Sequence, residues 1–279
     1  MLPLRDNIRP RRFPYVNYAL IGVCAVVFLL QVTAGDERGS TIVEMYGMIP
    51  QRVFHPDQPV FIEQQAVVRT DRGMEPAVIG QELAESPLPA WLTLFTCIFL
   101  HGGWLHFLGN MWFLHIFGDN VEDRLGHVGY LLVYLGWGVA ASAAHLLTNA
   151  SSPIPTIGAS GAIAGVMGAY MLLYPRATVL TLIPIFYFIQ IVVLPAPLFL
   201  AIWFLLQFFQ GAVSITAVNT TGVAWWAHIG GFVAGAAVAW LLRGGGMTSP
   251  PVEQQRPQTT RVGAHRYATP YRNYRRPDW

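Results

Sequence analysis

The sequence has 279 residues, of which 53% are hydrophobic and only 11% are charged, whereas soluble domains carry about 25% charged residues. The mean hydropathy is +0.42, and all 17 basic residues are arginine. These values exclude a disordered chain, a collagen, a coiled coil and an ordinary water-soluble enzyme, and they predict an integral membrane protein. Two cysteines, Cys24 and Cys97, lie in apolar stretches and are too few for a disulfide scaffold.

Apolar segments recur along the chain at the length of a membrane helix, which needs about 20 mostly apolar residues. We predict an all-α membrane protein, in which a six-helix transmembrane bundle occupies residues 16–243. The first apolar run is too long for a secretory signal and lacks a small-residue cleavage site, so we expect no cleavable signal. The predicted spans are residues 16–34, 104–121, 128–147, 160–174, 194–213 and 225–242.

A long first loop, residues 35–103, separates the first two predicted spans. Most of it is polar and acidic, whereas its last part, from residue 91, is apolar. This last part predicts an interfacial lead-in, so the loop is expected to be partly membrane-embedded. Within the loop, residues 60–72 form an insertion of possible strand character. We expect the whole loop on the extracytoplasmic side of the membrane.

The stretch 177–213 leaves two arrangements open, because it is uncharged but interrupted by prolines. It could contain one span preceded by an interfacial segment, or it could contain two spans. Arginines concentrate in the flank 1–15 and in the tail 244–279, and such segments stay in the cytoplasm. Both ends on one side require an even number of spans, which favours six. The tail is polar and without periodicity, so we predict that it is disordered.

Ser160 lies between two glycines in the segment Gly158-Ala159-Ser160-Gly161, at the start of the fourth predicted span. Backbone amides that are free at a helix N-terminus can donate to a developing oxyanion. The helix continues with small residues at positions 161, 164, 165 and 168, which would let a neighbouring helix approach closely. Ser160 is therefore either a nucleophile or one more small packing residue.

His228 opens the last predicted span, just inside a tryptophan pair of the kind found at membrane interfaces. With six spans, the fourth and the last both begin on the outer side, so Ser160 and His228 lie at the same end of the bundle. Small residues at positions 227, 231, 235 and 239 would allow the two helices to pack closely. A lone membrane histidine can instead serve a helix–helix hydrogen bond or a pore. Opposite a serine, a neutral imidazole is a suitable general base.

Neither of these spans holds a carboxylate near Ser160 or His228, so the residues predict a serine–histidine dyad and not a triad. The third member of a triad mainly orients the imidazole, and a buried carboxylate costs several kcal/mol. The sequence has no HExxH motif and no carboxylate pair within a span, which disfavours a metalloprotease or an aspartyl protease. No internal repeat is visible, which disfavours a secondary transporter.

His106 and Asn110 are four residues apart and share one face of the second predicted span. A ring N–H and an amide N–H can both donate to an oxyanion. On spacing alone, an interhelical polar clamp is an equal alternative. The fourth span, residues 160–174, is only about 22 Å long at 1.5 Å per residue. The loop before it must therefore dip into the membrane and line a wet pocket.

Three motifs follow one another along the chain: His101-x4-His106-x3-Asn110, Gly158-Ala159-Ser160-Gly161 and Ala227-His228-Ile229-Gly230-Gly231. In this order, within six spans, they resemble those of the rhomboid family of intramembrane serine proteases, and the resemblance covers residues 14–243. One position departs from the family pattern. Ala164 stands where an aromatic residue often packs on the base, so another group must orient the imidazole or the base is held more loosely.

The resemblance implies that Ser160 is the nucleophile and His228 the general base, later the general acid. His106, Asn110 and the backbone N–H of Ser160 would hold the oxyanion, and Gly158 would belong to the same substrate-stabilising set. The substrate would be the transmembrane helix of another membrane protein, cut near its outer end. It would enter past the fifth helix, whose aromatic residues at 203, 204, 208 and 209 face that route, and residues 214–224 would act as a mobile cap.

The same resemblance implies no cofactor, no metal and no nucleic-acid partner, only the lipid bilayer and membrane-protein substrates. It leaves the oligomeric state open. The expected location is the inner membrane of a bacterial cell, with both termini in the cytoplasm. The alternative function is a catalytically silent rhomboid-like protein that binds client transmembrane helices without cutting them, and it is disfavoured because every catalytic position is occupied.

Overall fold

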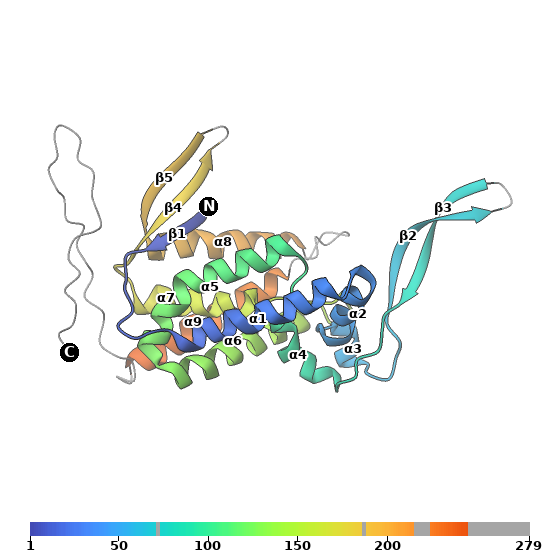
Figure 1. The fold of residues 1–279 in the computed structure, drawn as a ribbon, viewed down its shortest axis with the longest axis horizontal. Coiled ribbons are helices and arrows are strands. Elements are labelled where there is room, and N and C mark those ends of the chain that lie inside the picture. The colour runs from blue at the N-terminus through green and yellow to red at the C-terminus, as the bar shows by residue number, and fades with distance from the viewer. Residues whose placement is uncertain (71–72, 186–187, 215–223, 245–279) are drawn as a thin grey trace.

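A computed structural model of the chain describes residues 1–70, 73–185, 188–214 and 224–244. Helices lie side by side in an elongated bundle (Figure 1). They begin and end close to the predicted spans. The bundle helices are α1 (Tyr15–Thr33), α5 (Trp104–Leu125), α6 (His127–Thr148), α7 (Ser160–Leu173), α8 (Ala196–Ser214) and α9 (Trp225–Gly244).

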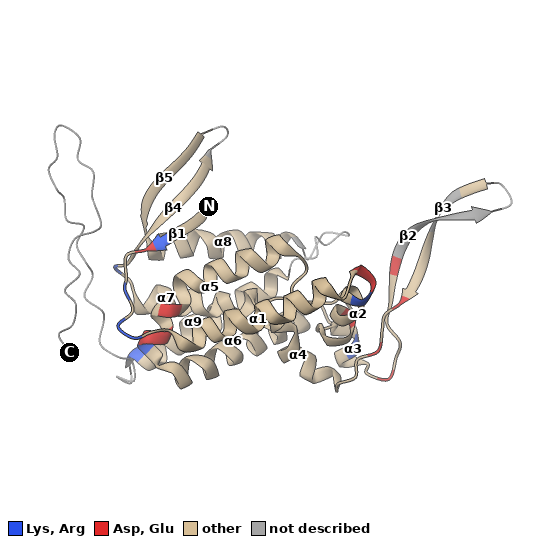
Figure 2. Cartoon of the chain, in the orientation of Figure 1, with Lys and Arg blue, Asp and Glu red and all other residues tan. Residues whose placement is uncertain are grey.

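Several helices of the bundle are long and apolar enough to cross a membrane. Among the described residues, four helices are long and apolar enough to cross a bilayer: α1, α6, and most of α8 and α9. A fifth candidate is α5 together with residues 90–99, which meet at an angle of 79°. Helix α7 is shorter, with 14 residues. Figure 2 shows that the drawn acids and arginines of the bundle gather at its two ends. The predicted fold class, a bundle of membrane helices, is confirmed.

The uncharged stretch 177–213 contains one membrane helix, α8, preceded by a β-hairpin. Strands β4 (Thr178–Ile185) and β5 (Phe188–Pro195) pair antiparallel, and β1 (Leu2–Asp6) adds to the other edge of β4 in the order β1-β4-β5. β-branched residues dominate both hairpin strands and favour extended backbone. Of the two arrangements left open by the sequence, the single span is correct, and the segment before it is a hairpin.

The first loop folds into short helices and a second hairpin. The strand character expected for residues 60–72 is confirmed for Phe61–Thr70, because β2 and β3 pair along their whole length, whereas residues 71–72 lie outside the described part of the chain. This hairpin projects away from the bundle (Figure 1). The elements of the loop are α2 (Asp36–Tyr46), α3 (Pro50–Phe54), β2 (Phe61–Thr70), β3 (Gly73–Glu82), the 3-10 turns η1 (Ala90–Leu92) and η2 (Cys97–Phe99), and α4 (Thr93–Thr96) between them.

Helices α7 and α9 are in direct backbone contact. A Cβ atom built on Gly231 would lie 2.0 Å from the carbonyl oxygen of Gly161, and one on Gly235 would lie 1.9 Å from that of Gly165. At the far end, Arg243 donates to the carbonyl of Leu172 at 2.7 Å. The small residues expected to form a packing strip therefore let the two helices run parallel with no side chain between them.

Polar contacts tie the N-terminal flank to the end of the bundle opposite Ser160. Glu122 of α5 accepts hydrogen bonds from the backbone N–H groups of Val16 at 3.0 Å and Asn17 at 2.7 Å, in the first turn of α1. A carboxylate at this position satisfies free N–H groups and favours the positive end of the helix dipole. Asp6 of β1 accepts hydrogen bonds from Asn120 and Tyr170. The flank 1–15 is thus joined to α5 and α7.

Two predictions concern residues outside the described part of the chain. The tail that we expect to be disordered corresponds, apart from its first residue, to residues 245–279. Most of the segment expected to act as a cap, residues 215–223, also lies outside the described residues.

The contact between α7 and α9 predicts that Gly235 tolerates no side chain. Gly235→Ala is expected to lower the free energy of unfolding by about 3 kcal/mol, because the methyl group would overlap the Gly165 carbonyl. Gly22→Ala in α1 is the matched control, since nothing lies within 4 Å of its Cβ position, and it should stay within about 1 kcal/mol of the parent. Unfolding in detergent micelles measures both. Equal stability of the two variants would contradict the close contact.

Asp6 predicts a pH dependence of stability. Burial raises the pKa of this carboxyl to about 7, although the hydrogen bond from Tyr170 partly opposes the shift. The native state therefore holds a proton that the unfolded state has released, so stability is lost as the pH rises from about 4 towards 7. Asp6→Asn removes this titration. We expect the unfolding temperature of the variant, relative to the parent, to rise between pH 5 and pH 8. A constant difference across this range would contradict the assignment.

Candidate active site

Ser160 and His228 meet at one end of the bundle. Ser160 is the first residue of α7, and His228 lies in the first turn of α9. The hydroxyl oxygen of Ser160 is 2.8 Å from Nε2 of His228, and both residues are half-buried. Because α7 and α9 run parallel in backbone contact, their first turns lie side by side. The distance is within the range expected between a nucleophile and its base.

Gly158 turns the chain just before Ser160. Its φ angle is +123°, a region that side chains rarely adopt, and its N–H donates to the carbonyl of Cys97 at 2.8 Å. A Cβ atom at this position would lie 2.7 Å from Nε2 of His106 and 3.6 Å from the hydroxyl oxygen of Ser160. Glycine is therefore required here both for the backbone and for the imidazole that covers it.

His106 presents one ring nitrogen to this site. Its Nδ1 accepts a hydrogen bond from the backbone N–H of Gly102 at 3.2 Å. A neutral imidazole carries its proton on the other nitrogen when one nitrogen accepts. Nε2, the atom nearest Gly158, is then an N–H donor that faces the neighbourhood of Ser160.

Asn110 lies one helical turn after His106 on α5. It is 8% exposed, and its Nδ2 has no hydrogen-bond partner within the described part of the chain. A buried donor without a partner costs about 1–3 kcal/mol, so it calls for an explanation such as a bound ligand or a water molecule. The structure thus brings Ser160, His228, Gly158 and His106 into contact range. Asn110 lies on the same face of α5 as His106, one turn further along the helix.

Gln207 of α8 is a member of the site that sequence reasoning left without a role. Its Oε1 lies 2.6 Å from Nδ1 of His228. The rings of Trp203 and Trp225 flank the imidazole, with centroids 5.9 Å and 6.1 Å away. Ala164 has no aromatic ring to pack on His228. The groups that contact the imidazole are instead Gln207 and the two tryptophans. The available signal was a glutamine within an otherwise apolar span, but no local pattern indicates which helix it contacts.

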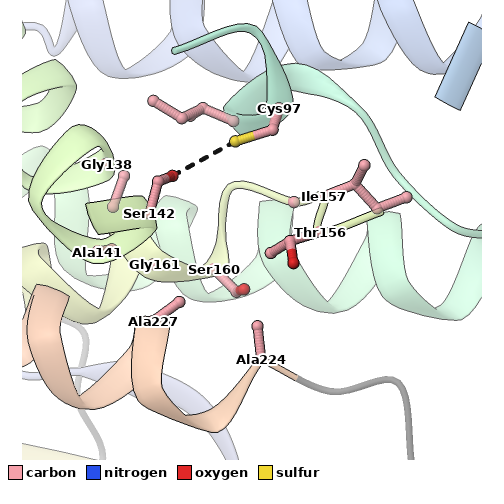
Figure 3. A pocket seen from close by; sticks show the side chains of 13 residues that line it. Cys97, Gly138, Ala141, Ser142, Thr156, Ile157, Ser160, Gly161, Ala224 and Ala227 are labelled. Carbon is pink, nitrogen blue, oxygen red and sulfur yellow. Dashed lines mark hydrogen bonds between the residues drawn. The ribbon is translucent and has the colours of Figure 1, made fainter. Parts of the chain in front are cut away.

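A small cavity lies beside the Ser160 hydroxyl (Figure 3). Its volume of about 20 Å³ has room for roughly one water molecule. At one side, the thiol of Cys97 lies 3.4 Å from the hydroxyl of Ser142. The cavity is lined by Cys97, Ile98, Gly138, Ala141, Ser142, Thr156, Ile157, Gly158, Ser160, Gly161, Ala162, Ala224 and Ala227. The wet pocket expected from the sequence stays a prediction, and this cavity is the space beside Ser160 in which water could lie.

Comparison with known proteins identifies the family. The sequence pattern of the Rhomboid domain matches residues 89–245, which is more than half of the chain. The chain belongs to the rhomboid family. The matched region contains the bundle helices α5 to α9 and every residue of the candidate site, whereas α1 and most of the first loop precede it. As a member of this family with several apolar helices, the chain is an integral, multi-pass membrane protein.

Curated relatives support the same family. The chain is 31% identical over 157 residues to Rhomboid-like protein 11, chloroplastic, of Arabidopsis thaliana, covering 55% of this chain and 53% of the relative. It is 37% identical over 81 residues to Putative rhomboid protease YdcA of Bacillus subtilis, covering 29% and 40%. It is 41% identical over 81 residues to Rhomboid protease GluP of Bacillus subtilis, covering 29% and 15%. The chain thus spans about half, or less, of the length of these relatives.

Proposed function

We propose that this protein is an intramembrane serine endopeptidase that cleaves the transmembrane segments of other membrane proteins through a Ser160–His228 dyad. The observation that carries the proposal is the 2.8 Å contact between the hydroxyl oxygen of Ser160 and Nε2 of His228. Membership of a family that includes proteins named as rhomboid proteases supports the reaction class. The residue roles are those expected from the sequence, and the geometry is compatible with each of them.

The chemistry follows from the contact. His228 Nε2 takes the proton of the Ser160 hydroxyl while the oxygen bonds to the scissile carbonyl carbon, which gives a tetrahedral oxyanion. When the intermediate collapses, the C–N bond breaks and the protonated imidazole gives its proton to the leaving amine. Water then attacks the acyl-enzyme with His228 again as base, and Ser160 is released. The small cavity beside Ser160 offers a place for that water.

Neutral donors surround the position of the oxyanion. The Nε2–H of His106, the Nδ2–H of Asn110 and the backbone N–H of Ser160 can donate to it, because the first N–H groups of α7 have no partner within the helix. Gly158 leaves the space in which the carbonyl would sit. The buried Nδ2 of Asn110 without a partner supports this role more directly than the polar clamp considered from the sequence.

The distribution of charges supports one orientation in the membrane. Arginines in residues 5–12 and at position 243 lie at the end of the bundle opposite Ser160, as Figure 2 shows for those drawn. Arginine-rich ends favour the cytoplasm, so we place both termini there and the site near the outer face. The inner membrane of a bacterial cell remains the proposed location.

The proposed entry route of the substrate lies along α8. A transmembrane substrate would reach the site past α8. Trp203 and Phe204 of this helix pack against Phe232 of α9, whereas Phe208 and Phe209 are exposed on the surface of the bundle.

Ser160→Ala and His228→Ala test the dyad. We expect each variant to abolish cleavage of a reporter transmembrane substrate and covalent labelling by a fluorophosphonate, because nucleophile and base act as one unit. Ser151→Ala, an exposed serine in the loop before α7, is the matched control and should leave both signals unchanged. Labelling that survives Ser160→Ala would reject the enzyme and favour the protein that binds client helices without cutting them.

His106→Ala and Asn110→Ala test the oxyanion site. Each should lower kcat by about 10²–10³-fold with little change in KM, because the donor acts mainly on charge that develops in the transition state. His115→Ala is the matched control, since this histidine is exposed on the same helix. An increase in KM at constant kcat would show that His106 and Asn110 bind the substrate and do not stabilise the oxyanion.

A further inference from the structure

Gln207 is the polar side chain that faces the far side of the His228 ring. Its Oε1 is 2.6 Å from Nδ1, while Nε2 on the opposite side of the ring contacts the Ser160 hydroxyl at 2.8 Å. The glutamine is 8% exposed, although it lies on a helix whose other large side chains mostly face outward. The imidazole is thus held between one hydroxyl and one amide oxygen.

The face of α8 that carries Gln207 is fixed by packing. Trp203 and Phe204 stack on Phe232 of α9, with ring centroids 6.2 Å and 4.7 Å apart. One turn beyond Gln207, a Cβ atom on Gly211 would lie 3.1 Å from Ile229 of α9. Positions 203, 207 and 211 repeat every four residues, so they share the side of the helix that meets α9. The side chain of Gln207 is therefore directed towards the imidazole by contacts on both sides of it.

With Oε1 of Gln207 facing the ring, the two hydrogen bonds fit one tautomer of His228. A carbonyl oxygen can only accept, so the contact with Oε1 places the ring proton on Nδ1. Nε2 then carries the lone pair that a general base needs against the Ser160 hydroxyl. The opposite tautomer would leave the Gln207 carbonyl facing a lone pair, and it would leave Ser160 facing an N–H that cannot take its proton.

We propose that Gln207 is a positioning residue of the site, whose amide oxygen holds His228 in the Nδ1–H tautomer with Nε2 directed at Ser160. This inference rests on the proposed function and adds a third member to the dyad expected from the sequence. It accounts for the missing ring at Ala164, because the base is oriented by the hydrogen bond that it donates to Gln207 of α8, together with the tryptophans that flank it.

An amide suits this place better than a carboxylate. During attack, the imidazole becomes a cation with N–H groups on both nitrogens, and the Gln207 carbonyl dipole stabilises the Nδ1–H throughout. A carboxylate would do this more strongly, but taking it out of water costs several kcal/mol when its partner is neutral in the resting state. The neutral amide supplies orientation without that cost, and an Asn serves the equivalent role beside the Cys–His pair of papain-like proteases.

The test compares three substitutions on α8 in the full-length protein in detergent. Gln207→Met keeps the length of the side chain and removes the acceptor, whereas Gln207→Glu keeps an acceptor. Gln210→Met is the matched control, because Gln210 is exposed on the same helix. Three experiments are made on each variant. The first measures the ¹⁵N chemical shifts of the His228 ring, assigned by loss of signal in His228→Ala. The second measures the rate constant for fluorophosphonate labelling of Ser160, and the third measures kcat and KM for a transmembrane reporter.

The expected result distinguishes a positioning role of Gln207 from a purely structural one. The parent shows the Nδ1–H tautomer, and Gln207→Met shows a mixture of tautomers with labelling and kcat about 10²-fold slower at constant KM. Gln207→Glu recovers at least 10-fold over Gln207→Met, and Gln210→Met matches the parent. If Gln207→Met does not fold, Gln207→Asn takes its place, since it withdraws the carbonyl by one methylene group, and the same loss is expected.

Other results overturn the inference. Labelling of Gln207→Met at the parent rate rejects the positioning role while the proposed function stands. Equal losses in the Met and Glu variants, or a change confined to KM, reject it in favour of a packing or entry role for this part of α8. If the parent itself neither labels nor cleaves, the proposed function fails and the positioning role fails with it.

Discussion

The backbone contact between α7 and α9 is the constraint on which the rest of the structure depends. The carbonyl oxygens of Gly161 and Gly165 lie only 2.0 Å and 1.9 Å from where the Cβ atoms of Gly231 and Gly235 would be. Helices this close leave no room for a side chain to separate their first turns. A serine at the start of one helix and a histidine in the first turn of the other therefore meet at hydrogen-bond distance. The small residues are spread over both helices, and the close approach that they allow brings one pair of side chains, Ser160 and His228, together.

The site is built almost entirely from neutral groups, which suits its place at the end of an apolar bundle. The described acids and arginines of the bundle lie at its ends. There, Glu122 accepts hydrogen bonds from the first turn of α1, and Asp6 accepts hydrogen bonds that join the N-terminal flank to α5 and α7. Around Ser160, the polar groups are hydroxyls, a thiol, imidazoles, amides and backbone N–H groups. Each can donate or accept without a permanent charge, so none carries the large desolvation cost of an isolated ion in lipid. In the proposed mechanism, the donors of the oxyanion site are already in place before any substrate arrives.

Much of the fold was predictable because its signals are local. Spans of apolar residues are read directly from the chain, and all six predicted spans correspond to helices of the bundle. The repeat of small residues at positions 227, 231 and 235 indicated a close helix contact, and the contact with α7 is observed. The hairpin of β4 and β5 was harder to predict, because an uncharged run of β-branched residues broken by prolines fits either strands or membrane segments. The pairing of β1 with β4 joins parts of the chain far apart in sequence, and no local pattern specifies it.

The residues of the candidate site also fall into those that local sequence patterns indicate and one that only the packing of the helices reveals. Ser160, His228, His106, Asn110 and Gly158 belong to short motifs, so the sequence could name them together. Gln207 belongs to none of these motifs, and its contact with His228 depends on the rotation of α8 about its own axis, which Trp203 and Phe204 determine through α9. The absence of an aromatic residue at Ala164 indicated that another group orients the base or that the base is held more loosely, and only the packed structure places Gln207 beside it.

The most direct test of this account is an experimentally determined structure of the protein after reaction with a fluorophosphonate. The account predicts phosphorus bonded to the Ser160 oxygen, His228 Nε2 within hydrogen-bond reach of that oxygen, and the phosphonyl oxygen directed at His106 and Asn110. An adduct on a different residue, or Ser160 and His228 held apart by intervening side chains, would contradict it.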